Sequence, residues 1–305
     1  MKRYLVLGGN GFLGRYIVDR LSIDNKVIVA DYNIENSNTN SNVTYKKLNF
    51  IDCNDFSEYL EDVDVVIHLI STIIANDNVS NIKKDINDNV FPTIKLLDSM
   101  AENNVRSIFF VSSGGTVYGE HDNSPIKESE PINPICNYGI IKSTIENYLN
   151  LYNIYYGINY KIVRLANPYS DITKTGKKQG IISIAIDNIL EGKQIVIWGD
   201  GNDVRDYIYI EDAIDAIVKV INYNGLEKVF NIGTGIGYSI NDILNIIKDK
   251  LNLQYIDVDY QKPRYCDVKN NILDITKIKS ELNWEPKVEL HDGIQRVLDI
   301  KRRRI

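Results

Sequence analysis

Short apolar segments of strand length alternate with segments of helical spacing in the first half of the chain. The apolar runs are mostly continuous, which is typical of strands buried on both faces of a sheet. They lie at residues 4–7, 26–30, 43–48, 63–69, 108–112 and 161–165. Between them apolar residues recur every three or four positions, as at Leu13, Ile17 and Leu21, which indicates helices. This order predicts an α/β fold, a Rossmann-type doubly wound parallel sheet.

The regular alternation loosens after about residue 166. Proline and glycine break the following stretch into shorter pieces, so we expect a smaller, mixed α/β lobe there. Residues 228–232 form another strand-like run that would return to the main sheet. The predicted first domain therefore comprises residues 1–165 and about 206–234, and the predicted second lobe comprises residues 166–205 and 235–305.

Three glycines follow the first predicted strand and precede a helix. Gly8, Gly11 and Gly14 are spaced by three, as needed for a tight turn, close approach to a pyrophosphate and helix packing. Asp31 ends the second strand, where a carboxylate accepts hydrogen bonds from an adenosine ribose and repels a 2′-phosphate. The turn predicts a dinucleotide, and Asp31 predicts NAD rather than NADP, although Asp31 is also compatible with an ordinary loop acid. A second glycine-rich segment, residues 233–237, is interpreted as a plain loop.

A tyrosine and a lysine four residues apart are the candidates for chemistry. Tyr138 and Lys142 share one face of a helix, and the lysine cation together with an oxidised nicotinamide would favour the phenolate. The spacing alone decides nothing, since Tyr265 and Lys269 repeat it. Only the first pair begins an apolar helix downstream of the strand at residues 108–112. We therefore interpret it as a base that works near neutral pH, against the alternative of a surface pair.

Five segments together carry a resemblance to a known family. They are the glycine turn, Ser112-Ser113-Gly114-Gly115-Thr116-Val117-Tyr118-Gly119, Tyr138 with Lys142, Asn167-Pro168, and the stretch from Trp198 to Tyr207. In them the chain resembles the extended short-chain dehydrogenase/reductase family, and most closely its UDP-glucose (UDP-galactose) 4-epimerase branch. The resemblance covers nearly the whole chain.

The resemblance implies a transient oxidation of a nucleotide sugar. Tyr138 would take the proton of the sugar 4-hydroxyl while hydride passes from C4 to NAD⁺, and hydride return to the opposite face of the 4-keto sugar would invert C4. Lys142 would also hold the nicotinamide ribose. The first domain would bind NAD and the second lobe a UDP-hexose.

The family positions also imply two sets of contact residues. Those expected at the cofactor are Gly8, Gly11, Phe12, Leu13, Gly14, Asp31, Asn49, Phe50, Leu69, Ser71, Asn89, Ser112, Tyr138, Lys142 and Pro168. Those expected at the substrate are Ser113, Thr116, Asn167, Ile181, Val196, Trp198, Arg205, Arg264, Asp267 and Asn271.

Four residues of the second set have expected roles. Arg205 and Arg264 would grip the diphosphate, Asp267 the nucleotide ribose, and Trp198 would line the uracil pocket. A core position for Trp198, and an ion pair of Arg205 with a neighbouring aspartate, Asp203 or Asp206, remain open.

The chain departs from the family pattern at Gly114. The family usually has a serine or threonine there, four residues before Tyr118, whose hydroxyl meets the sugar 4-oxygen. Glycine cannot relay a proton, so Thr116 is the candidate replacement, with Ser113 or a water as alternatives. The segment also lacks the Asp-Glu pair of the family's dehydratases, which disfavours dehydration.

A second departure concerns Asn271. A bulky tyrosine that restricts some of these epimerases to non-acetylated sugars would fall at this position. Asparagine is smaller, so we expect N-acetylhexosamine nucleotides to be accepted as well as hexose nucleotides.

Composition and charge exclude several other functions. The formal net charge of −6 over 305 residues disfavours nucleic acid and membrane surfaces as partners. The basic run Lys301-Arg302-Arg303-Arg304 is interpreted as a solvated chain end. Three scattered cysteines and three isolated histidines predict neither disulfides nor a metal site. Without a signal peptide or a membrane-spanning segment in the sequence, we expect a cytoplasmic protein.

The helix at residues 145–156 is apolar on more than one stripe. We therefore expect a homodimer, with burial beneath the second lobe as the alternative. Other functions that stay open are a nucleotide-sugar 4-ketoreductase, a UDP-glucuronate 4-epimerase and a non-catalytic NAD-binding sensor.

Overall fold

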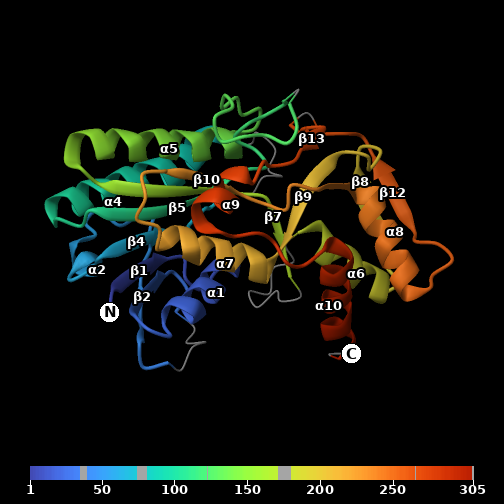
Figure 1. Cartoon of the computed structure of the whole chain (residues 1–305), viewed down its shortest axis with the longest axis horizontal. Coiled ribbons are helices and arrows are strands. Elements are labelled where there is room, and N and C mark those ends of the chain that lie inside the picture. Colours follow the sequence, from blue (N-terminus) through green and yellow to red (C-terminus); the bar gives the residue numbers. More distant parts are fainter. Residues whose placement is uncertain (35–39, 74–80, 122, 171–179, 265, 304–305) are drawn as a thin grey trace.

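The computed structural model describes residues 1–34, 40–73, 81–121, 123–170, 180–264 and 266–303. Two parts are evident in Figure 1, a large sheet covered by helices and a smaller lobe that contains α6, α8 and α10. Tyr265, of the second Tyr/Lys spacing, lies outside the described residues.

A seven-stranded parallel sheet forms the larger part, and it confirms the predicted fold class. The strand order is β3-β2-β1-β4-β5-β6-β10. The chain thus passes from β1 to opposite sides of the sheet, which opens a crevice at the carboxyl ends of β1 and β4. The strands are β1 Arg3–Leu7, β2 Lys26–Asp31, β3 Val43–Lys47, β4 Val65–His68, β5 Ser107–Ser113, β6 Asn159–Leu165 and β10 Val229–Ile232.

The central strands are buried as their continuous apolar runs predict, and β4 is buried along its whole length. β3 differs because it is the edge strand. Thr44 and Lys47 are exposed there, and the first buried side chain of the predicted run is Leu48. The expectation of burial on both faces was therefore wrong for residues 43–48.

Helices cover both faces of the sheet (Figure 1). On one face lie α1 Phe12–Leu21 and α7 Ile210–Ile221, and on the other α2 Ser57–Leu60, α4 Phe91–Glu102 and α5 Asn137–Tyr156. A short helix α3, Ile82–Asp85, and a π-helical turn, Ile86–Val90, lead into α4. Each face has its own apolar core, so the sheet holds the carboxyl ends of its strands rigidly.

The smaller lobe is built around β9, which pairs with β7, β11 and β13. A separate pair of parallel strands, β8 and β12, lies beside it. The strands are β7 Asn167–Tyr169, β8 Ile195–Trp198, β9 Val204–Tyr209, β11 Gly237–Ser239, β12 Val258–Gln261 and β13 Asn270–Asn271; the helices are α6 Ile181–Leu190, α8 Ile240–Leu251 and α10 Leu290–Arg302. Helix α9, Thr276–Leu282, packs against β10 of the main sheet. Strand β10 returns to the main sheet beside β6. The boundaries of the two lobes stay a prediction.

The C-terminal basic run is not simply a solvated chain end. Lys301 belongs to α10 and is buried. Its ammonium donates to the carbonyl oxygen of Ser183 at 3.1 Å and pairs with Asp187. This lysine therefore fastens α10 to α6, while Arg304 lies outside the described residues.

Candidate active site

The glycine turn lies at the crevice between β1 and β4. Gly8 has a φ of +80°, which favours glycine, and a Cβ at Gly14 would lie 2.4 Å from the carbonyl oxygen of Gly8. The carboxylate of Asp31 accepts hydrogen bonds from the backbone N–H groups of Asn10 at 3.0 Å and Asn33 at 3.2 Å. A tight turn, a helix N-terminus and a carboxylate at the end of β2 thus meet, and this set fits a dinucleotide.

The other residues expected at the cofactor divide into two groups. Phe12 and Leu13 begin α1, and Leu69 and Ser71 follow β4 at the same edge of the sheet. The side chains of the second group are held by protein partners: Asn49 by Asp52, Phe50 by Phe56 and His68, Asn89 by Thr72 and Asp85, and Ser112 by Glu146. The contacts that are expected between these residues and the cofactor stay a prediction.

Tyr138 and Lys142 lie on the first turns of α5. The Lys142 ammonium donates to the carbonyl oxygen of Val111 at 2.9 Å and lies 5.6 Å from the Tyr138 ring centroid. Within the described part of the chain the Tyr138 phenol makes no hydrogen bond. Burial raises its pKa to about 12, and the Cys136 thiol adds to the rise. Burial lowers the pKa of Lys142 to about 8, against the attraction of Glu146.

In the protein without bound cofactor, Lys142 alone does not shift the phenol toward its phenolate. There, burial outweighs the attraction between the two side chains, and the phenol keeps its proton. The contribution expected from the second positive charge, that of an oxidised nicotinamide, stays a prediction.

The loop after β5 explains why a glycine stands at position 114. A Cβ there would lie 2.5 Å from Cδ1 of Leu273, a fully buried side chain. Asn271 is also fully buried, and its amide donates to the carbonyl oxygen of Gly114 at 3.0 Å. Leu273 thus fills the space that a serine side chain would need.

Thr116 lies beside the start of α5, because a Cβ at Gly139 would be 2.5 Å from the carbonyl oxygen of Thr116. Its Oγ1 is buried without a hydrogen-bond partner among the described residues. An enclosed hydroxyl without a partner is unfavourable.

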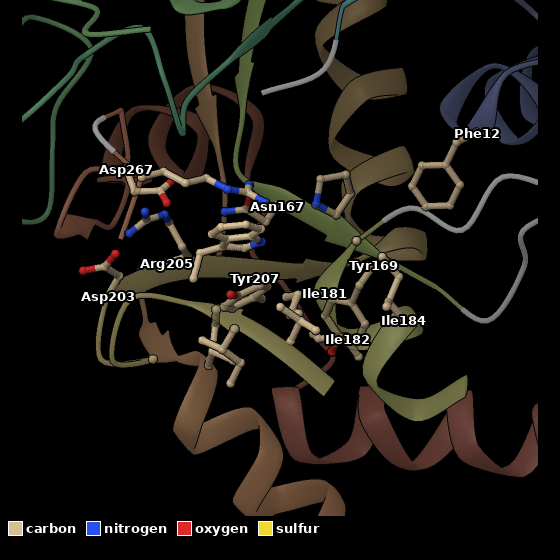
Figure 2. A pocket seen from close by; sticks show the side chains of 18 residues that line it. Phe12, Asn167, Tyr169, Ile181, Ile182, Ile184, Asp203, Arg205, Tyr207 and Asp267 are labelled. Atoms are coloured by element: carbon tan, nitrogen blue, oxygen red, sulfur yellow. The ribbon is translucent and has the colours of Figure 1, made fainter. Parts of the chain in front are cut away.

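A cavity of about 550 Å³ opens between the main sheet and the smaller lobe. Seven residues expected at the substrate line it, namely Asn167, Ile181, Val196, Trp198, Arg205, Arg264 and Asp267, together with Phe12 and Pro168 of the cofactor set. In Figure 2, Arg205 and Asp267 lie at one end of the cavity and Phe12 at the other. Ser113, Thr116 and Asn271 are not in its wall. Asn271 is fully buried, and its expected effect on acetylated sugars stays a prediction.

The two arginines of the cavity are available to a ligand. No carboxylate of the described residues lies within 4 Å of either guanidinium; Arg205 donates to the carbonyl oxygen of Val204, and Arg264 stacks on Trp198 at 4.7 Å. Asp206, one of the aspartates considered for Arg205, is buried and accepts from Thr234. Trp198 is 44% exposed, so it is not a core residue.

Asn167 connects the cavity with the loop after β5. Its amide donates to the carbonyl oxygen of Asp206 at 3.0 Å. A Cβ at Gly115 would lie 4.0 Å from the Asn167 Oδ1 and 3.9 Å from the Ser113 Oγ. The loop that carries Ser113 and Thr116 therefore adjoins the cavity at Asn167.

Sequence reasoning missed two kinds of residue here. Asp203 and Tyr207 line the cavity, and their positions two residues before and two residues after Arg205 would have indicated them. Glu146 and Arg164 form a buried ion pair beneath Lys142. The spacing of four residues between Lys142 and Glu146 would have indicated the acid. No spacing could have indicated Arg164, because it lies on β6 and not on the same helix.

Two further properties follow from the described residues. They contain no group of three or more histidine, cysteine or acidic side chains arranged to hold a metal ion. Among their helices we find none with the length and apolar character needed to cross a membrane.

Known proteins resemble the chain over almost its whole length. It is 38% identical over 301 residues to a putative UDP-glucose 4-epimerase of Methanocaldococcus jannaschii, with 97% of each chain covered. It is 30% identical over 307 residues to a dTDP-4-dehydro-6-deoxyglucose reductase of Escherichia coli, with 96% of each covered. The crystal structure of a UDP-glucose 4-epimerase from Thermotoga maritima, with UDP-glucose, matches with a TM-score of 0.91, 32% identity and 99% of each chain covered.

A family model gives the same result. The model described as "NAD dependent epimerase/dehydratase family" matches residues 4–233. This match includes the glycine turn, Tyr138 with Lys142, and β10, and it agrees with the resemblance inferred from the motifs. The chain belongs to the NAD dependent epimerase/dehydratase family.

Proposed function

We propose that this chain is an NAD-dependent epimerase that inverts C4 of a UDP-hexose. The observation that carries the proposal is the cavity, in which Arg205 and Arg264 are free of carboxylate partners among the described residues while Asn167 adjoins the loop after β5 that carries Ser113 and Thr116. A diphosphate needs cations at one end, and a reacting sugar needs Tyr138 near the other. The similarity to UDP-glucose 4-epimerases supports the same substrate class.

When bound, NAD⁺ supplies the acceptor that takes hydride from the sugar C4 and returns it. The glycine turn and Asp31 would hold its pyrophosphate and adenosine ribose. The Tyr138 phenolate accepts the proton of the sugar 4-hydroxyl, and the Lys142 ammonium stabilises that phenolate. The keto sugar turns while the diphosphate stays on Arg205 and Arg264. The proton then returns from Tyr138, so the enzyme ends the cycle unchanged.

Thr116 supplies the hydroxyl that Gly114 lacks. In this proposal its Oγ1 turns toward the sugar and passes the proton between the 4-oxygen and Tyr138. Its unmet hydrogen-bonding capacity supports the role, because a hydroxyl engaged elsewhere would first have to leave its partner.

Replacing Thr116 with valine is expected to lower kcat by roughly 100-fold, since proton transfer by a positioned group contributes at least that much. Valine keeps the shape of the side chain, and the lost hydroxyl has no partner among the described residues, so the melting temperature should not fall. Thr116→Ser is the control and should retain most of the rate. If the valine variant is fully active, Ser113 or a water, and not Thr116, passes the proton between the sugar and Tyr138.

The proposed reaction is tested directly with UDP-galactose. Purified protein should convert it to UDP-glucose, followed by the anomeric proton signals in NMR, without net consumption of NAD⁺ or NADH. The same assay with UDP-N-acetylgalactosamine and UDP-galacturonate defines the sugar. If none of these substrates undergoes C4 inversion, the proposed activity is wrong.

A 4-ketoreductase is the second candidate, because the Escherichia coli relative is a dTDP-4-dehydro-6-deoxyglucose reductase. Such an enzyme would consume reduced cofactor stoichiometrically with a 4-keto sugar nucleotide. Asp31 at the end of β2 disfavours the 2′-phosphate of NADPH. Oxidation of NADPH that keeps pace with product formation would favour the reductase.

We also propose a homodimer formed through α5. Ile140, Leu151, Ile154 and Tyr155 are exposed on this helix at helical spacing. An apolar stripe of this kind favours a partner helix. Light scattering should give twice the chain mass, and Leu151→Glu with Tyr155→Glu should give the single-chain mass.

The cytoplasm is the proposed location. Cys53, Cys136 and Cys266 are unpaired thiols, which fits a reducing compartment. The net charge of −6 supports a small molecule rather than nucleic acid as the partner.

A further inference from the structure

Two side chains of α5 are held by two consecutive residues at the end of β5. Lys142 donates to the carbonyl oxygen of Val111 at 2.9 Å. Glu146, one helical turn later, accepts a short hydrogen bond from the hydroxyl of Ser112. This double attachment fixes the turn of α5 that carries the lysine against the carboxyl end of the sheet.

Glu146 is also the centre of a buried charge network. Its carboxylate pairs with Arg164 of β6 at 2.8 Å, and both side chains are at most 6% exposed. Arg164 is the register partner of Ser112 and donates to the hydroxyl of Tyr118 at 2.9 Å. That hydroxyl in turn donates to the Oδ1 of Asn231 at 2.7 Å. The network therefore joins α5, the loop after β5, which contains Tyr118, and β10.

The remaining surroundings of Lys142 offer it little stabilisation as a cation. Its ammonium lies 4.7 Å from the Phe110 ring and 5.6 Å from the Tyr138 ring. His68, behind it on β4, is buried, and its pKa is lowered to about 3, so it stays neutral. Arg164 is itself a cation and repels Lys142. Of the acids next to this part of α5, Asp88 pairs with Lys84 and Asp85 accepts from Asn137. Glu146 is the acid of the described residues whose charge acts on the lysine.

We propose that Glu146 is a positioning residue that keeps Lys142 in its cationic form beneath Tyr138. Arg164 and Ser112 hold the carboxylate in place, and the carboxylate offsets the cost of burying the lysine charge. The inference rests on the proposed role of Lys142 in stabilising the Tyr138 phenolate.

A purely mechanical anchor would not require a charge. Replacing a buried ion pair with apolar side chains of similar volume is often neutral for stability, so the pair is poorly explained by folding alone. A neutral amide at position 146 would still accept the hydrogen bond of Ser112. The two roles therefore differ in one respect, since only the electrostatic role depends on the negative charge.

The first test measures the lysine itself and needs neither substrate nor turnover. Protein labelled with ¹³C at the lysine Cε is titrated by NMR, and the Lys142 signal is assigned from its loss in Lys142→Met. The wild-type midpoint should lie at about 8. In Glu146→Gln it should fall by about 1 unit, because an opposite charge at close range has been removed. This result stands or falls independently of whether the protein is an epimerase.

The second test follows the rate of C4 inversion against pH. Loss of the Lys142 proton ends activity at alkaline pH, so a midpoint that moves from about 8 to about 7 lowers kcat roughly 8-fold at pH 8.5 and less than about 1.5-fold at pH 6.5. A general structural defect would lower kcat by the same factor at both pH values. The KM for the UDP-hexose should stay unchanged.

Tyr118→Phe is the matched control, because it removes a hydrogen bond from the same network without removing a charge. Its Lys142 midpoint should equal that of the wild type. If Glu146→Gln does not fold, Glu146→Met combined with Arg164→Met replaces it. A smaller fall in the same direction is expected, because the loss of the Arg164 cation offsets part of the loss of the Glu146 carboxylate. A midpoint in the charge-removing variant within about 0.3 unit of the wild type, well below the expected shift, overturns the proposal.

Discussion

Replacing Tyr138 with phenylalanine is expected to lower kcat for C4 inversion by about 10³- to 10⁴-fold, the upper part of the range for a lost general base. The ring would remain near the ammonium of Lys142, so the helix should keep its place. The lost hydroxyl has no hydrogen-bond partner within the described residues, and the melting temperature should not fall. The rate is measured by NMR on UDP-galactose, and bound NAD is measured after denaturation.

Tyr152→Phe provides the control for this variant. Tyr152 lies on the same helix, and its hydroxyl donates to Asp98 at 2.5 Å, away from the cavity. Its loss should cost about 1 kcal/mol of stability and leave kcat unchanged. If Tyr138→Phe keeps the wild-type rate, another base removes the proton and the mechanism is wrong. If Tyr138→Phe also loses bound NAD, Tyr138 acts in cofactor binding, and the lower kcat does not identify it as the base.

The fold could be predicted from the sequence because the patterns that indicate it are local. Continuous apolar runs and helical spacing reflect which faces each element buries, and the alternation of the two determines a parallel sheet. The exception, β3, was misjudged because the sequence does not reveal which strand lies at the edge. Position along the chain also separated Tyr138 with Lys142 from the same spacing at residues 265 and 269.

The part of the site that the sequence could not supply depends on contacts between distant residues. In the sequence, Gly114 is only a departure from the family motif, and the structure shows that Leu273 occupies the space of a side chain there. Asn271, which donates to the carbonyl oxygen of Gly114, lies 157 positions away in the sequence. Counting along the chain assigned Asn271 to the substrate pocket, but its full burial and its bond to Gly114 come from the pairing of β13 with β9. The pKa of Tyr138 likewise depends on burial that no spacing reveals.

The two arginines of the cavity lead to the other large effect. Arg205 lies on β9 and Arg264 on the loop after β12, so a diphosphate between them would be held from two elements. Each guanidinium gives charge-assisted hydrogen bonds that contribute about 1.5 to 3 kcal/mol. Asp203 and Asp267 line the same cavity, and removal of both cations would leave a diphosphate facing only negative charge.

Replacing both arginines with alanine is therefore expected to weaken UDP binding by about 10³-fold, and either single change by about 10- to 100-fold. Calorimetry with UDP measures the dissociation constants. Fluorescence offers a second readout, since Trp198 lies in the cavity under Arg264 whereas Trp284, the other tryptophan, is buried. Arg296→Ala is the matched control, because that arginine pairs with Glu211 outside the cavity and should leave binding unchanged. If the double variant binds UDP with wild-type affinity, the diphosphate is bound elsewhere. If the affinity is unchanged but kcat at saturating UDP-hexose falls, the two arginines act on the reacting sugar instead.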